Sequence, residues 1–216
     1  MGTVLVSSIL ARAQDELNDI DGERWDPSRL VDFINEGQRA IVEVKPTAFV
    51  LAQSVQLQPG TAQALPASGI QLIDIPRNMG TDGATPGRVV RRADRRVLDA
   101  RAPMWHQAEA DAEVRHFMFD GDTPRRYYVY PPQPATACGY VEMVMGAMPP
   151  TIGQNDAISL DDVYDPALLD YVLYRAFSKD TEFAADQNRS SAHYQAFAAA
   201  IGAKAKAEAA TNPNAK

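Results

Sequence analysis

The sequence predicts an α+β fold: a four-helix bundle formed by N- and C-terminal helices, an inserted antiparallel β domain, and a flexible C-terminal tail. Three observations predict it. Apolar residues recur every three or four positions near both ends of the chain. Between these regions lie short strand-like segments that Pro and Gly turns separate. One helix-start motif, an aromatic residue followed by Asp and Pro, occurs once in each helical region.

The helix-start motif is WDP at residues 25–27 and YDP at residues 164–166. An Asp before the first turn can accept hydrogen bonds from unpaired backbone N–H groups, and Pro at the first helical position has no N–H to satisfy. The aromatic residue is expected to pack on Leu30 or Leu169 as a hydrophobic staple. Each motif therefore predicts a helix that starts at its Pro.

Composition narrows the protein class. The chain has 216 residues, 45% hydrophobic and 23% charged, which is typical of a soluble globular protein. We expect no membrane span and no signal peptide, because no apolar run is long enough and the first residues lack a basic region. The single cysteine, Cys138, excludes an internal disulfide and is expected to be a small buried residue in a strand region.

The net charge of −7 is concentrated in the predicted helices. Residues 1–45 and 151–200 carry net charges of −4 and −5, residues 46–150 are neutral, and residues 201–216 carry +2. An acidic body argues against tight nucleic-acid binding, which depends on neutralising phosphates, but is compatible with a surface that DNA slides past.

The first half of the predicted bundle comprises residues 1–48. The spacing of Val6, Leu10, Ala13, Leu17 and Ile20 predicts a helix over residues 3–20. A second helix is expected over residues 27–44, and Pro46 ends it.

Residues 49–157 form the predicted insertion, a small β-sandwich or barrel-like domain. The strand-like segments are residues 72–75, 88–92, 114–119, 126–130 and 140–145. Asp94 is expected to cap a short helical turn that contains Val97 and Leu98.

Residues 158–202 form the second half of the predicted bundle. Helices are expected over residues 166–184 and 188–201, with Phe183, Tyr194, Phe197 and Ile201 facing the core and Gly202 as the stop. The tail, residues 203–216, has no apolar stripe and is expected to be flexible.

Two clusters suggest chemistry. His106, Glu109, Glu113 and His116 are residue types that bind metals, but the HExxH spacing is absent, so a solvated loop is the favoured interpretation. A metal-dependent hydrolase is the less favoured alternative. We expect no catalytic residues, no metal and no cofactor.

The second cluster is an arginine-rich run, residues 88–101, followed by a tyrosine-rich strand. Arginine pairs well with carboxylates, and the acidic helices offer partners, so a subunit interface is favoured over nucleic acid. An alternative is a carbohydrate- or receptor-binding module that uses Trp105 and the tyrosines. The candidate interface residues are Arg88, Arg91, Arg92, Arg95, Arg96, Trp105, Tyr128 and Tyr130.

Several stretches resemble one family in order and spacing. They are DRRVLD at 94–99, PMWH at 103–106, PRRYYVYPP at 124–132, YRAFSKDTEF at 174–183, and residues 25–39. They are similar to the head-to-tail adaptors of short-tailed bacteriophages, also called tail tubular protein A or head–tail connector proteins. The likeness spans most of residues 25–202.

The resemblance implies a structural virion protein at the head–tail junction, assembled in the host cytoplasm. It implies a homo-oligomeric ring of twelve copies between the portal protein and the tail nozzle protein, through which genomic DNA passes during ejection. It also implies portal binding by the C-terminal segment. The corresponding candidate residues here are Gly202, Lys204, Lys206, Asn212, Pro213 and Lys216.

Overall fold

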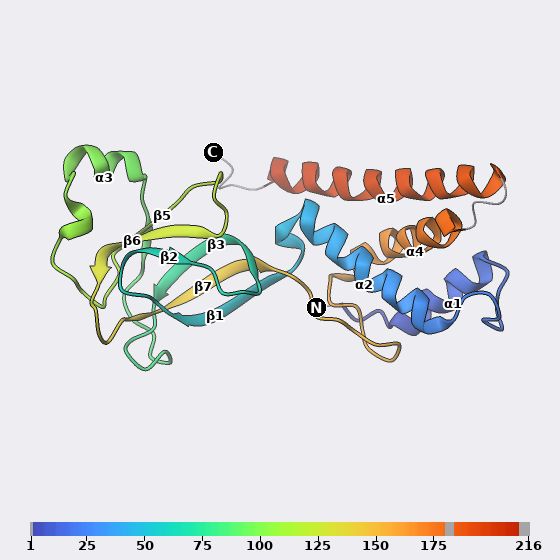
Figure 1. Ribbon diagram of the computed structural model, residues 1–216, viewed down its shortest axis with the longest axis horizontal. Helices are drawn as coiled ribbons and strands as arrows, with labels where there is room; N and C mark the ends of the chain where they lie inside the picture. Colours follow the sequence, from blue (N-terminus) through green and yellow to red (C-terminus); the bar gives the residue numbers. More distant parts are fainter. Residues whose placement is uncertain (1, 180–183, 212–216) are drawn as a thin grey trace. The chain divides into compact units, whose positions relative to one another are not determined.

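The computed structural model describes residues 2–179 and 184–211, and within these residues it has five α-helices and two β-sheets (Figure 1). The protein is therefore an α+β protein. The chain divides into two compact units. The helical unit comprises Met1–Phe49 and Pro149–Lys216, and the β unit comprises Val50–Met148.

The helical unit contains four of these helices, α1, α2, α4 and α5. In it, α4 packs against α5, α2 and α1, and α1 also packs against α2. Short 3-10 helices, η1 and η3, follow α2 and precede α4. The bounds are α1 Val6–Glu16, α2 Pro27–Val44, η1 Pro46–Ala48, η3 Asp162–Tyr164, α4 Asp165–Lys179 and α5 Ala184–Thr211. None of the described helices has both the length and the apolar character needed to cross a bilayer.

The two helix-start motifs behave differently. The Asp26 carboxylate accepts a hydrogen bond from the Ser28 amide at 2.8 Å and caps α2, as predicted. The prediction for Asp165 is wrong: its carboxylate pairs with the Arg12 guanidinium of α1. The side-chain cap lies four residues earlier, where Asp161 accepts from the Val163 amide and starts η3.

The first helix is shorter than predicted at both ends. At its start, the Asp162 carboxylate binds the amides of Thr3 and Val4 and the Thr3 hydroxyl, which holds these residues outside the helix. At its end, Asn18 adopts a left-handed conformation with φ of 51°. Ile20, predicted to face the core, is 73% exposed as a result.

The last helix is longer than predicted, because Gly202 does not stop it and α5 continues to Thr211. A mid-helix Gly costs only about 1 kcal/mol, and the alanines that follow are the strongest helix formers. Residues on both sides of Gly202 attach α5 to the helical unit. Ile201 is buried, and the Lys204 ammonium lies 4.2 Å from the centroid of the Tyr164 ring. Tyr194, predicted to face inward, is exposed, and Phe183 lies outside the described residues.

Buried amide side chains fasten the segment that returns from the β unit. Asn35 of α2 donates to the carbonyl of Ile152 and accepts from its amide, at 2.9 and 3.0 Å. One turn later, Gln38 accepts from the Ser159 amide at 2.8 Å. These bonds place residues 149–157 in the helical unit, whereas the sequence analysis assigned them to the insertion.

The β unit has a three-stranded sheet, β1-β7-β3, and a four-stranded sheet, β2-β6-β5-β4. All pairings are antiparallel except β4 with β5, which is parallel and departs from the antiparallel prediction. The strands are β1 Val50–Gln56, β2 Gly60–Ala64, β3 Gly69–Asn78, β4 Arg91–Arg92, β5 His116–Phe119, β6 Arg126–Gln133 and β7 Tyr140–Ala147. Between β4 and β5 lie α3 Arg95–Arg101 and the short helix η2 Trp105–Gln107.

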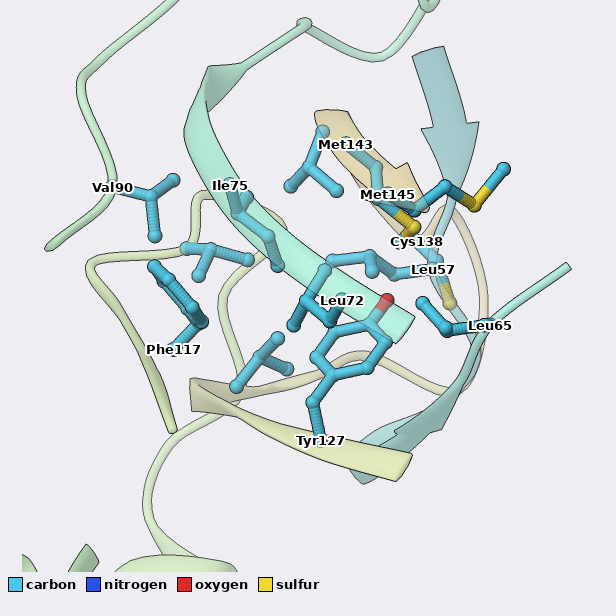
Figure 2. Packing of buried hydrophobic residues seen from close by; sticks show 13 residues of the cluster. Leu57, Leu65, Leu72, Ile75, Val90, Phe117, Tyr127, Cys138, Met143 and Met145 are labelled. Carbon is cyan, nitrogen blue, oxygen red and sulfur yellow. The ribbon is translucent and has the colours of Figure 1, made fainter. Parts of the chain in front are cut away.

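Side chains from both sheets form one hydrophobic core (Figure 2). The three-stranded sheet contributes Leu72, Ile75 and the methionines of β7, while the other contributes Phe117 and Tyr127. Cys138 is buried, as predicted, but it lies in the loop before β7 rather than in a strand, and its thiol donates to the Pro134 carbonyl.

Within the described part of the chain, Tyr127 places a buried hydroxyl group without a hydrogen-bond partner in this core. Its ring is 1% exposed, and its hydroxyl has no hydrogen-bond partner among the described residues, so burial raises the pKa of Tyr127. A buried polar group without a partner costs about 1–3 kcal/mol. We therefore expect Tyr127→Phe to raise the free energy of unfolding by about that amount, measured by urea denaturation; a loss of stability would show that the hydroxyl is satisfied in solution.

The loop after β3 gives a pH-dependent prediction. The Asp82 carboxylate accepts hydrogen bonds from the Ala84 amide, the Thr85 amide and the Thr85 hydroxyl, which lowers its pKa from 3.8 to about 2. These bonds stabilise the loop fully above pH 3.8, and that contribution is lost as the pH falls towards 2. The stability difference between wild type and Asp82→Asn should therefore shrink from pH 5 to pH 2; a constant difference would contradict the ionic origin.

Candidate functional site

The tyrosines of β6 alternate between the core and the outer face. Tyr127 and Val129 are buried in the core, while Tyr128 and Tyr130 are partly exposed on the other side of the sheet. This is the two-faced arrangement that the period-two spacing predicts.

Trp105 covers the outer tyrosines. It lies in η2, is only 2% exposed, and contacts Tyr128 and Tyr130 edge-on, at 6.0 and 6.5 Å between ring centroids. The His106 ring stacks on it at 3.7 Å, and the indole N–H donates to the Asp99 carboxylate at 2.8 Å.

That hydrogen bond holds α3, the helix that carries the arginines. None of the seven residues of α3 is buried, so the helix has no apolar anchor of its own. Its N-terminus is capped by Asp94, which accepts from the Arg96 amide at 2.9 Å, as the sequence analysis expected. Two side-chain contacts therefore hold α3 on the sheet: the bond between Trp105 and Asp99, and Arg95 over the Tyr128 ring.

A pocket of about 680 Å³ opens between α3 and the turn that joins β5 to β6. Met118, Phe119 and Tyr128 supply apolar and aromatic lining. Around them stand four arginines and two aspartates: Arg92, Arg95, Arg96, Arg126, Asp94 and Asp120. We call this the arginine pocket.

The arginines of the pocket are only partly neutralised. Arg95 pairs with Asp99 at 3.6 Å and lies over Tyr128, and Arg92 lies over the Phe119 ring. Within residues 2–179 and 184–211, neither Arg96 nor Arg126 has an ion-pair partner. The pocket thus combines unpaired cationic groups with an apolar wall, which suits an anionic partner that also carries an apolar group.

Three of the four residues considered for a metal site contact other side chains instead of one another. His106 shares a 2.7 Å hydrogen bond with the Thr61 hydroxyl, His116 stacks on Tyr130, and Glu113 pairs with Arg88. In the part of the chain that the structure describes, no three His, Cys, Asp or Glu side chains are grouped as a metal site would require.

The comparison with protein families decides the identity of the chain. The family model described as SU10 adaptor protein matches residues 5–216, nearly the whole sequence. The chain belongs to the SU10 adaptor protein family. This makes it a structural adaptor of a bacteriophage, a virion component that contacts other capsid and tail proteins. No curated protein matched the chain.

Membership in the SU10 adaptor family favours a structural, non-enzymatic role. The structure argues against sugar stacking on Trp105. Trp105, the ring that would stack on a sugar, is buried within the β unit and bonded to Asp99.

The candidate portal-binding residues of this SU10-family adaptor fall on α5 and beyond. Lys204 is held over Tyr164, Lys206 is exposed, and Gly202 is part of the helix. Asn212, Pro213 and Lys216 lie outside the described residues.

Sequence reasoning missed the arginine pocket itself. It grouped Arg88 to Arg96 by proximity, but Arg126 and the β5–β6 turn come from a distant segment. The parallel pairing of β4 with β5 brings these parts together, and no local pattern signals that pairing.

Proposed function

We propose that this protein is a head-to-tail adaptor that forms a ring between the portal and the tail nozzle. In this proposal twelve copies surround a lumen through which genomic DNA passes during ejection, and the four helices of the helical unit act as one bundle. The observation that carries the proposal is the family match over residues 5–216. The motifs that resemble short-tailed phage adaptors support it, and two of them, DRRVLD and PRRYYVYPP, overlap α3 and β6.

The charge distribution supports a conduit for DNA. The helical unit carries eighteen acidic and eleven basic residues, whereas the β unit carries ten of each. An excess of negative charge repels phosphates and limits adhesion of DNA to the wall. In the proposal DNA therefore moves through the ring without sequence-specific binding.

We further propose that the end of α5 docks on the portal. Lys206 is exposed and basic, and the helix continues beyond the Lys204–Tyr164 contact to Thr211. An exposed helical end can bury new surface on a partner.

The test of the proposal is assembly with the portal protein of the same phage. Mixed with purified portal, the adaptor should give a discrete complex by mass photometry, with a mass increment that corresponds to a ring of adaptor copies. A mixture that contains only free portal and free adaptor at micromolar concentration would overturn it.

Removing residues 206–216 tests the docking segment. We expect the truncated protein to unfold at nearly the wild-type temperature, because Ile201 and Lys204 remain, and to lose portal binding. Differential scanning calorimetry and mass photometry measure the two effects. A large loss of thermal stability would show that the segment belongs to the fold, and undiminished portal binding would place the docking site elsewhere.

A further inference from the structure

We infer that the arginine pocket of one copy receives the α1–α2 loop of a second copy of the chain. The inference rests on the proposed ring and names the contact that links neighbouring copies. It follows from two surfaces with matching chemistry, one in each unit of the chain. The loop comprises residues 17–26.

The charges and the apolar wall of the arginine pocket determine which partner can bind there. Arg96 and Arg126 stand at it without ion-pair partners in the described part of the chain, and Arg92 has only the Phe119 ring. The wall between these guanidinium groups is formed by Met118, Phe119 and Tyr128. A suitable partner therefore presents carboxylates next to an apolar side chain.

The α1–α2 loop has this composition. Residues 17–26, LNDIDGERWD, contain four acidic residues and one basic residue, Arg24. Ile20, directly before the exposed Asp21, has at 73% the highest exposure of the large hydrophobic side chains described. Asp21 and Glu23 are exposed and have no ion-pair partner in the described residues.

The loop is already held in one shape. The Asp19 carboxylate is buried and accepts hydrogen bonds from the Arg24 and Trp25 amides, at 3.2 and 2.7 Å. The chain reverses through left-handed conformations at Asn18 and Gly22, with φ of 51° and 68°. These constraints keep Ile20 and Asp21 outward, so little conformational entropy is lost when the loop binds.

The pairing is compatible with a ring. Each copy carries one loop and one pocket. The contact is heterologous when the loop enters one neighbour and the pocket receives another, whereas two copies that exchange loops would form a closed dimer. A heterologous contact passes from copy to copy and closes into a ring when the rotation per copy allows it. At this contact the arginines of the pocket face the carboxylates of Asp21 and Glu23, which carry the opposite charge.

Charge exchange tests the inference. The pocket variant is Arg96→Glu with Arg126→Glu, and the loop variant is Asp21→Arg with Glu23→Arg. Each alone places like charges at the contact and should weaken ring assembly on the portal roughly a hundredfold. A chain that carries both pairs of substitutions, or an equimolar mixture of the two variants, should assemble again. The mixture should give rings in which the variants alternate.

The matched control is Arg101→Glu with Arg125→Glu, which changes the charge of the β unit equally but lies outside the pocket lining. Mass photometry with portal is the readout, and circular dichroism verifies folding. Rescue by exchange supports the inference. Rings from either single-surface variant at wild-type concentrations, or failure of the exchange to rescue, overturns it and leaves the proposed function standing.

Two further outcomes of these experiments would overturn the inference. If the pocket variant assembles normally but loses binding to double-stranded DNA or inorganic phosphate, the occupant is an anion of that kind and the inference is overturned. If the wild-type protein never assembles on the portal, the proposed function fails, and the inference fails with it.

Discussion

Replacing Trp105 by Ala should lower the free energy of unfolding of the β unit by about 3–5 kcal/mol. The side chain is buried against Tyr128, Tyr130 and His106, so the substitution leaves a large cavity above β6. It also removes the hydrogen bond to Asp99, the one described side-chain bond between η2 and α3. The helix that carries Arg95 and Arg96 then keeps the contact of Arg95 with Tyr128 but loses its hydrogen bond to η2.

Trp105→Phe is the intermediate variant. It keeps a buried aromatic ring but removes the pyrrole ring together with its N–H, so its cost should be smaller than that of Trp105→Ala, about 1–3 kcal/mol. Urea denaturation measures stability, and hydrogen exchange at residues 95–101 measures release of α3. Equal losses for both variants would show that the hydrogen bond dominates, while no increase in exchange in α3 would contradict its dependence on Trp105.

Replacing Phe33 by Ala should cost the helical unit about 3–5 kcal/mol as well. Phe33 is fully buried in α2, with the Trp25 ring edge-on at 6.1 Å between ring centroids. Three cations surround its ring: the Arg29 and Arg175 guanidinium carbons and the Lys179 ammonium lie 5.3, 5.1 and 5.5 Å from its centroid. One side chain therefore joins α2 to the end of α4.

Phe33→Leu is the matched control, because it keeps an apolar side chain and removes the aromatic ring. If the cations contribute, Phe33→Leu should still lose about 0.5–2 kcal/mol. Thermal and urea unfolding followed by circular dichroism at the helical wavelength give both values. A leucine variant as stable as wild type would show that the ring acts through volume alone.

Local patterns in the sequence were sufficient for several elements. The Asp26 cap, the Asp94 cap and the alternation of Tyr127 with Tyr128 depend on residues one to three positions apart, and the structure contains all three. The α+β class follows from the change in hydrophobic period along the chain.

Features that depend on distant residues escaped prediction. The second motif was misread because Arg12, far away in the chain, pairs with Asp165, and Asp161 supplies the cap instead. Residues 149–157 group with the helical unit, because Asn35 and Gln38 bind the backbone of residues 152–159, and amides in a helix carry no local signal of such partners.

The arginine pocket was also only partly predictable, because it combines residues that are distant in the chain. Local density identified the arginine run and the tyrosines, but not that Trp105 is buried beneath the surface or that Arg126 joins Arg96 at one pocket. The end of α5 was misjudged because the high helix propensity of alanine outweighs one Gly in a helix that tertiary contacts already anchor.

The central claim is that copies of this chain form a ring that caps the portal. Electron microscopy of the purified portal with the adaptor added in excess is its most direct test. Averaged end-on views should show an added ring of twelve adaptor densities coaxial with the portal channel. Portal particles with no added density, or with adaptor copies attached singly and without rotational order, would contradict it.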